Sequence, residues 1–162
     1  MRASGTSDHV IRHARPTDEP AIATLLAASD LPLDGVHAAL SGFLVTEHEG
    51  EIIGVAGIEA CGLAGTHALL RSVAVSMAWQ SRGLGRALVT RAIAEAEARG
   101  VQELYLLTTT ADDYFPTFGF SVTSRDAVPP DIRATAEFRV ACPASATVMM
   151  RATSITPAVT AT

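Results

Sequence analysis

The chain has 162 residues, of which 48% are hydrophobic and 18% charged, a composition that fits one globular domain and excludes a disordered protein. Its formal net charge of −5 speaks against a nucleic acid as partner. No apolar stretch approaches the roughly 20 residues of a membrane span, and residues 1–8 lack the apolar core of a signal peptide. We therefore expect a cytoplasmic protein that binds neither nucleic acid nor membrane.

The first half of the chain alternates short strands and helices within a single domain, expected over residues 9–152 between flexible segments at 1–8 and 153–162. A strand is expected over 10–14, a helix capped by Thr17 or Asp18 over 19–29, and a short helix over 36–40. Strands over 43–47 and 52–61 form a hairpin around Glu49-Gly50. A fourth strand covers 66–76.

The second half begins with the strongest helical pattern of the chain, over 83–99, whose broad apolar face suits packing on a sheet. Gly100 ends this helix. The apolar run 104–107 is typical of a strand buried on both faces. A short helix over 111–118 that stops at Gly119, a strand over 120–123, a helix over 131–137 and a strand over 146–151 complete the domain.

Residues 80–85, Gln-Ser-Arg-Gly-Leu-Gly, stand between the fourth strand and the long helix. Glycine uncovers backbone N–H groups here, and the unpaired amides and dipole of a helix start favour an anion. The chain has no lysine, which excludes a mononucleotide P-loop. Leu88 stands where a dinucleotide fingerprint needs its third glycine. The turn therefore predicts a site for some other phosphate ligand.

Val73-Ala74-Val75 followed by residues 80–85 resembles the pyrophosphate-binding signature of the GNAT superfamily of acetyl-CoA-dependent N-acetyltransferases, Gln/Arg-x-x-Gly-x-Gly/Ala after an alternating strand. The order of expected elements, from about residue 10 to 152, is also that of the GNAT fold. The resemblance implies an α/β fold with a mixed, twisted sheet of about seven strands flanked by about four helices. It further implies that the parallel strands over 66–76 and 104–107 splay apart to hold the coenzyme.

The same resemblance implies which residues bind acetyl-CoA, the expected co-substrate. Backbone groups of residues 73–75 would hold the pantetheine arm, and the Val73 N–H would polarise the thioester carbonyl, where charge builds up during attack. Amides of residues 82–87 would hold the pyrophosphate, with the side chains of Arg82 and Arg86 either assisting or remaining solvated. The expected coenzyme-binding residues are Val73, Ala74, Val75, Gln80, Ser81, Arg82, Gly83, Leu84, Gly85, Arg86 and Ala87.

Several groups are candidates for protonating the leaving thiolate. The family uses a tyrosine in a motif like Ala-x-x-Phe-Tyr-x-x-x-Gly-Phe, and in residues 111–120 the register puts Phe115 at its place. Tyr114 points about 100° away from Phe115 on a helix, so it serves only if the helix rotates. The alternatives are a water, unassisted departure, or a hydroxyl of Thr108, Thr109 or Thr110. Tyr114 could instead be a core aromatic with a bonded hydroxyl.

A general base is needed because an amine is mostly protonated at pH 7. Glu59 is the first candidate, since it is a carboxylate in an otherwise apolar strand, where burial without a purpose is costly. It could equally be an edge residue that faces water. Glu137 is the second candidate, and we also count it among the expected substrate-binding residues.

Arg71 gives the best indication of the acceptor. Alternation along the strand puts Arg71 on the same face as Val73, toward the acceptor cleft. A guanidinium in an apolar strand needs an anionic partner, which is either an internal carboxylate such as Glu59 or an acidic group of the substrate. Arg71, Thr108 and Glu137 are the expected substrate-binding residues.

Several further segments narrow the resemblance to small bacterial GNAT proteins known as arsenic-resistance N-acetyltransferases. These are residues 70–75, 106–111, 115–120, 137–138 and 142–146. That resemblance implies an amino-acid-like acceptor that carries an oxyacid. Neither Cys61 nor Cys142 fits a metal spacing, so we expect no metal site, and Cys142 before proline is typical of a small buried side chain.

The sequence therefore predicts an N-acetyltransferase in which the primary amine of a small, anionic acceptor attacks acetyl-CoA directly. An alternative is a sensor or partner module that binds acetyl-CoA without turnover, which the phenylalanine at position 115 favours. Acetylation of a protein or peptide is a third possibility. A homodimer is common in the superfamily, although no surface pattern of this chain points to one.

Overall fold

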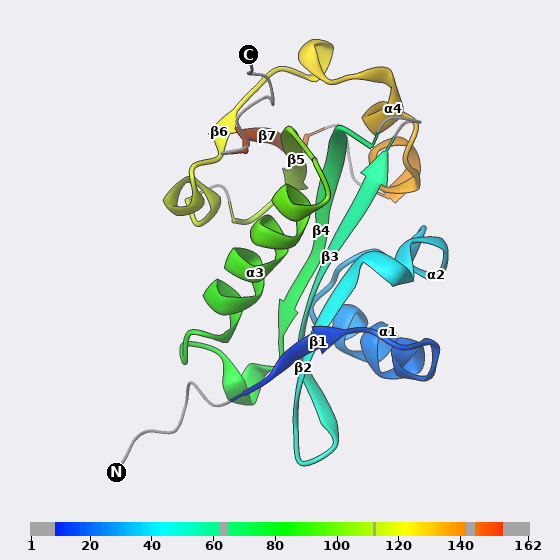
Figure 1. Cartoon of the computed structure of the whole chain (residues 1–162), viewed down its shortest axis with the longest axis vertical. Helices are drawn as coiled ribbons and strands as arrows, with labels where there is room; N and C mark the ends of the chain where they lie inside the picture. Colours follow the sequence, from blue (N-terminus) through cyan, green and yellow to red (C-terminus); the bar gives the residue numbers. More distant parts are fainter. Residues whose placement is uncertain (1–8, 62–64, 112, 142–144, 154–162) are drawn as a thin grey trace, which may run out of the picture.

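The computed structural model describes residues 9–61, 65–111, 113–141 and 145–153 (Figure 1). Within these ranges the chain folds into one seven-stranded sheet with helices on both faces. None of the helices described is long and apolar enough to cross a bilayer. The expected flexible segment 1–8, Cys142 and the residues from 154 onward lie outside the described ranges.

The first half of the chain forms antiparallel strands and two helices. Its elements are β1 (Ile11–His13), α1 (Glu19–Ala28), α2 (Val36–Ala39), β2 (Phe43–His48), β3 (Glu51–Cys61) and β4 (His67–Val75). The turn of the β2–β3 hairpin puts Glu49 (φ 51°) and Gly50 (φ 82°) in the left-handed region, which suits a tight hairpin. Each of these elements was expected from the sequence, and the predicted bounds differ by one residue at most.

The second half adds α3 (Leu84–Ala98), β5 (Glu103–Thr108), β6 (Ser121–Val122), α4 (Pro130–Arg133) and β7 (Thr147–Ala152). Two predicted helices differ from the structure. The helix expected over 111–118 is only a 3-10 helix, Phe115–Phe118, which Gly119 ends at a φ of 93°. The helix expected over 131–137 stops early, because the Thr135 hydroxyl donates to the Ile132 carbonyl, and a π-helical turn, Glu137–Ala141, follows.

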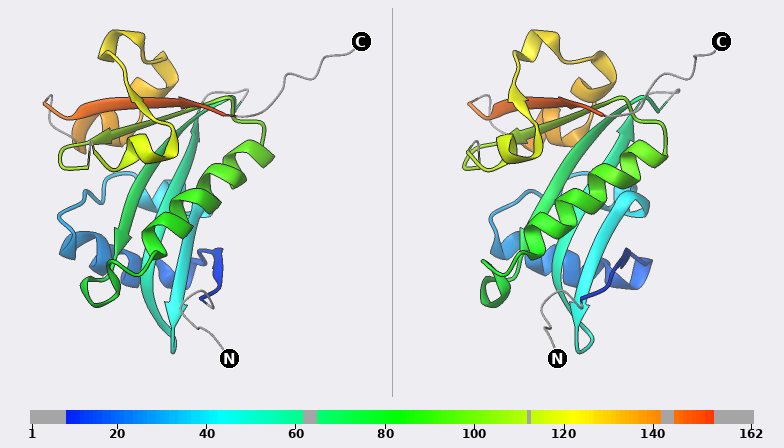
Figure 2. Two further views of the ribbon diagram at one scale, coloured as in Figure 1. Left: turned by 90° about the vertical axis from the view of Figure 1, so that its left-hand side faces the viewer. Right: turned by 60° about the vertical axis from the view of Figure 1, so that its left-hand side comes forward.

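The sheet has the order β1-β2-β3-β4-β5-β7-β6, and its two faces carry different helices (Figures 1 and 2). Helix α3 packs Leu88, Val89 and Ala92 on Leu70 and Leu104. Helix α1 covers the opposite face, with a cluster formed by Ile22, Leu25, Leu26, Phe43 and Val45. Both faces of β4 are therefore buried, which explains its nearly continuous apolar sequence.

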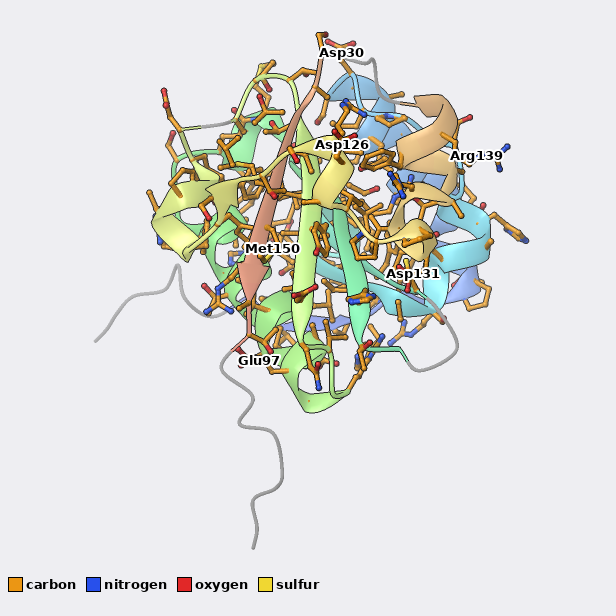
Figure 3. The ribbon with its side chains drawn as sticks, turned by 90° about the horizontal axis from the view of Figure 1, so that it is seen from above. Asp30, Glu97, Asp126, Asp131, Arg139 and Met150 are labelled. Atoms are coloured by element: carbon orange, nitrogen blue, oxygen red, sulfur yellow. The ribbon has the colours of Figure 1, made fainter. Side chains whose placement is uncertain are left out.

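Strands β4 and β5 are paired at one end and separate at the other. Their parallel pairing covers three residue pairs and ends at Leu69 and Tyr105, whereas β4 continues to Val75. At the paired end His67 contacts Glu103 at 3.4 Å and Asp131 of α4 at 3.1 Å, and Figure 3 labels Asp131 over this end of the sheet. The mixed α/β fold with splayed central strands, expected from the sequence, is confirmed.

A β-bulge interrupts β4 just beyond this point. Gly57 of β3 lies opposite Arg71 and Val55 lies opposite Ala74, so β4 has one extra residue in this stretch. Ser72 adopts a φ of 59°, which marks the bulge. Leu70 and Val73 consequently both pack in the α3 cluster, which leaves Arg71 on the opposite face. The alternation argument that gave Arg71 and Val73 one face is therefore wrong, because it counted no bulge.

Candidate active site

The gap between β4 and β5 is a cavity of about 260 Å³. Its walls come from both strands, from the loop after α1, from the segment after β5 and from the π-helical turn. The lining side chains are Asp30, Leu31, Pro32, Leu70, Arg71, Ser72, Val73, Leu106, Leu107, Thr108, Thr109, Thr110, Ala111, Tyr114, Phe115 and Glu137. A mostly apolar cavity with a few polar groups is typical of a small-molecule site.

The predicted phosphate turn borders a second, open hollow, lined by Val75, Gln80, Ser81, Gly83, Gly85, Arg86 and Tyr114. Gly83 caps α3 with a φ of 86°, and Ser81 is also left-handed at 66°. The Gln80 side chain donates to the Val75 carbonyl at 3.0 Å, which ties the turn to the end of β4. Tyr114 lines both hollows, so a ligand that spans them passes beside its ring.

The start of α3 presents unpaired amides to this hollow. The Ala87 N–H donates to the Gly83 carbonyl at 3.0 Å and is committed to the helix. The amides before it, from Gly83 to Arg86, have no intrahelical acceptor, as in the first turn of any helix. Backbone N–H groups at a helix start bind anions because the helix dipole adds to their charge.

The two arginines of the turn stack on aromatic rings. Arg82 lies 4.7 Å from the centre of the Trp79 ring, and Arg86 lies 4.8 Å from that of Phe118. Arg86 also donates to the Thr117 hydroxyl at 3.4 Å. Arg86 lines the open hollow beside the predicted phosphate turn, whereas Arg82 does not. The geometry therefore makes Arg86 the better candidate for a side-chain contact with a phosphate.

Tyr114 and Phe115 have separate positions. Phe115 is buried in the α3 cluster, while the Tyr114 hydroxyl lies 3.3 Å from the point where a Cβ on Gly85 would be. Burial raises the pKa of Tyr114, although Arg86 opposes this shift. The position favours contact with a ligand at the junction of the two hollows.

Thr108 ends β5 on the cavity wall. Its hydroxyl oxygen accepts the N–H of Ala111 at 2.9 Å and that of Thr110 at 3.3 Å, which shapes the turn after the strand. Thr108 therefore has a structural task in addition to its place in the cavity. Thr109 and Thr110 line the same wall.

Arg71 is the centre of a buried ionic cluster. Its side chain is fully buried and contacts carboxylates of Glu59 at 3.0 Å and Glu137 at 3.3 Å. It also donates to the Ser72 hydroxyl at 3.2 Å and to the Asp34 carbonyl. The internal ion pair with Glu59 that the sequence left open is therefore present. Two of the five guanidinium N–H groups remain without a partner among the described residues.

The two carboxylates of this cluster differ in their surroundings. Glu137 is 4% exposed and lines the cavity. The pKa of Glu137 is raised to about 7, mainly by burial and in smaller part by the charge of Glu59, while the charge of Arg71 acts in the opposite direction. The Glu59 side chain is 23% exposed and lines a separate hollow beside Gly42 and Arg99. Sequence reasoning ranked Glu59 first because it could not show which carboxylate faces the cavity.

The pattern of the acetyltransferase (GNAT) family matches residues 10–120, which is more than half of the sequence. The chain therefore belongs to the GNAT acetyltransferase family. Its parallel β4–β5 wedge and the glycine turn before α3 are the features of the structure that the family signature predicted.

Two amino-acid acetyltransferases of Neisseria meningitidis, from serogroups A and B, are each 30% identical to this chain over 126 residues. The match covers 78% of this chain but only 28% of each relative. An uncharacterized N-acetyltransferase of Chlorobaculum tepidum is 27% identical over 133 residues, which is 78% of this chain and 84% of that protein.

Among solved structures, N-acetylglutamate synthase from Neisseria gonorrhoeae, complexed with coenzyme A and L-arginine, has a TM-score of 0.76 at 26% identity. The similarity covers 91% of this chain and 34% of the synthase. A Mycobacterium tuberculosis protein solved in complex with CoA shares the fold, with a TM-score of 0.73 at 24% identity over 88% of this chain and 98% of that one. This chain thus spans about a third of the neisserial proteins.

Proposed function

We propose that this chain transfers the acetyl group of acetyl-CoA to the primary amine of a small, amino-acid-like acceptor that carries an acidic group. The observation that carries this proposal is the pair of hollows at the α3 turn and in the wedge, which share Tyr114 as a lining residue and are lined by Val75 and Val73 of β4 respectively. A pyrophosphate at the turn would leave the thioester beside the bulge, where Val73 lines the cavity.

The β-bulge of β4 places backbone groups where the thioester is proposed to lie. Ser72 and Val73 lie between two successive pairs of the β3–β4 ladder, those of Arg71 and Ala74, and the pairing with β5 has already ended at Leu69. A Val73 N–H directed at the thioester oxygen would stabilise the charge of the tetrahedral intermediate. Tyr114 is the proposed proton donor to the thiolate, and residues 80–87 are the proposed coenzyme cradle.

Two observations support an amino-acid-like acceptor. The N. meningitidis relatives are amino-acid acetyltransferases by name. Arg71, on the cavity wall, has N–H groups left over after its internal contacts and could bind an acidic group. The closer relationship to arsenic-resistance acetyltransferases, and a cytoplasmic location, remain predictions from the sequence.

The experiment is a binding measurement followed by a turnover screen. Isothermal titration with acetyl-CoA tests the cradle, and release of free thiol is then measured over a panel of amino acids, amino-acid amides, alkylamines and amino-oxyacids. We expect binding and release with at least one acidic amine. Binding without release on any amine would support the alternative, an acetyl-CoA sensor. No binding would refute both functions.

A further inference from the structure

Glu59 and Glu137 both contact the guanidinium of Arg71, but only Glu137 lines the cavity between β4 and β5. Glu137 lines the cavity between the strands together with Val73 and Thr108. Glu59 contacts the same Arg71 and lies beside a different hollow. Among the described residues, the Glu137 carboxylate makes one ion pair, through Oε1 to Arg71 Nε. Its second oxygen has no hydrogen-bond partner within those residues.

We propose that Glu137 takes the proton from the ammonium of the acceptor, and that Arg71 and Glu59 are positioning residues that hold it on the cavity wall. This assignment rests on the acetyltransferase function proposed above. It replaces Glu59 as the base, because a base must reach the attacking nitrogen directly or through one water.

The ionic surroundings of Glu137 suit this task. The charged groups that face it are Arg71 from β4, which lowers its pKa, and Glu59 from β3, which raises it. A pKa of about 7 leaves a substantial fraction of the carboxylate ionised at neutral pH and still able to hold a proton. The ion pair fixes one oxygen of Glu137, so that the other is available for the ammonium.

Glu137 accepts one proton of the ammonium and later releases it to solvent. The neutral nitrogen attacks the thioester carbon, an N–C bond forms, and the C–S bond breaks to release coenzyme A thiolate. The nitrogen loses a second proton as the intermediate collapses, and this proton converts the thiolate to the thiol. The products are the acetamide, coenzyme A and one proton.

The test is the pH profile of kcat/KM for the best amine of the screen, measured for the wild type and for Glu137→Gln. For the wild type we expect a rise that levels off above pH about 7. The variant should lose about 10²-fold or more near pH 7. Its remaining rate should climb tenfold per pH unit toward the pKa of the amine, which is ~10 for an alkylamine. Unchanged affinity for acetyl-CoA confirms that the variant folds.

Glu59→Gln is the matched control, because it removes the other carboxylate of the same arginine. Since Glu59 raises the pKa of Glu137, this variant should shift the rising part of the pH profile, its acidic limb, to lower pH without abolishing it. An abolished limb in Glu59→Gln would show that Glu59 is the base and overturn the assignment. The assignment would also be overturned if Glu137→Gln were as active as the wild type at every pH.

If Glu137→Gln fails to fold, Glu137→Asp provides the second variant, with the carboxylate kept one methylene further from the cavity. We expect a reduced kcat and a retained acidic limb in this variant, and loss of the limb would contradict the proposal. A wild type without thiol release on any amine would refute the proposed function itself. That outcome is distinct from a wild type that turns over without need of Glu137.

Discussion

The two ends of the wedge offer different groups to the ligands proposed above. The phosphate end offers backbone amides around Gly83, in an open hollow whose shape depends on a few adjacent residues. The acceptor end uses side chains, with Arg71 fully buried and Glu137 4% exposed. A backbone cradle tolerates most side-chain changes, whereas a buried ionic cluster fails when one member is lost. Variants at each end test this difference, and loss of the buried cation should have the greatest consequence.

Replacing Arg71 by methionine should destabilise the protein most. Glu59 and Glu137 would then face each other without a cation, and breaking a buried ion pair in this way costs about 3–5 kcal/mol. Urea unfolding at pH 8 measures the loss. Arg12 is the matched control because it also binds two carboxylates, those of Asp18 and Glu47, but keeps 20% side-chain exposure.

Arg12→Met should cost only about 1 kcal/mol, as expected for a solvent-accessible pair. Equal losses for Arg71→Met and Arg12→Met would show that the acceptor cluster is no more demanding than a surface network. Arg71→Lys keeps the charge but not the forked geometry of the guanidinium, so its loss of stability should lie between those of Arg71→Met and Arg12→Met.

The stability of the folded protein should also depend on pH through Glu137. Its pKa rises from 4.5 to about 7 on folding, mainly through burial, so the folded state holds this proton more tightly than the unfolded state. The contribution to unfolding free energy is therefore lost as pH rises from about 4.5 to 7, by roughly 3 kcal/mol at most. Urea midpoints for the wild type and Glu137→Gln over this range measure it, and parallel curves would contradict the prediction.

At the phosphate end, Gly83→Ala should weaken coenzyme binding at a modest cost in stability. A Cβ at Gly83 meets no atom within 4 Å, so the substitution acts through its φ of 86° rather than through a clash. A non-glycine residue in this conformation costs about 1–2 kcal/mol. Gly50→Ala is the control, since Gly50 has a φ of 82° and equally open surroundings, in the hairpin turn.

Both alanine variants should lose similar stability, but only Gly83→Ala should reduce acetyl-CoA affinity, by tenfold or more. Calorimetric titration and thermal unfolding of the pair give the two values. Equal coenzyme affinities would remove the phosphate assignment from the turn.

The smallest effect is expected from Tyr114→Phe. This variant removes only the hydroxyl at the junction of the two hollows and keeps the ring contacts with Phe115 and Phe118. If the hydroxyl protonates the thiolate, kcat should fall several-fold while acetyl-CoA affinity stays within twofold. Tyr105→Phe, whose hydroxyl donates to Glu103 at 2.9 Å, is the control and should leave kcat unchanged. A silent Tyr114→Phe would exclude this tyrosine as the acid.

The turn and the helix start at the phosphate end could be predicted from the sequence because their signals are local. Residues 80–85 carry a glycine pattern that specifies a turn and a helix start without reference to the rest of the chain. Apolar periodicity located the strands and α3 in the same way. The pairing of β4 with β5, and its early end, followed from the family resemblance.

The acceptor half could not be predicted because it assembles residues from distant segments. Asp34, Glu59, Arg71 and Glu137 meet only in the folded chain, and nothing local to Glu137 indicates its burial. The bulge at Ser72 also leaves no clear mark, since serine rarely adopts a φ of 59°. That one inserted residue reversed the face on which Arg71 lies.

In the function proposed here, acetyl-CoA binds with its pyrophosphate at the α3 turn and its thioester in the β4–β5 wedge. The most direct measurement is a titration of ¹⁵N-labelled protein with acetyl-CoA, followed by amide chemical shifts. We expect large shifts for amides of residues 82–86 and 73–75, and none for the hairpin turn at Gly50. Saturable binding that leaves the amides of residues 82–86 and 73–75 unmoved would contradict it.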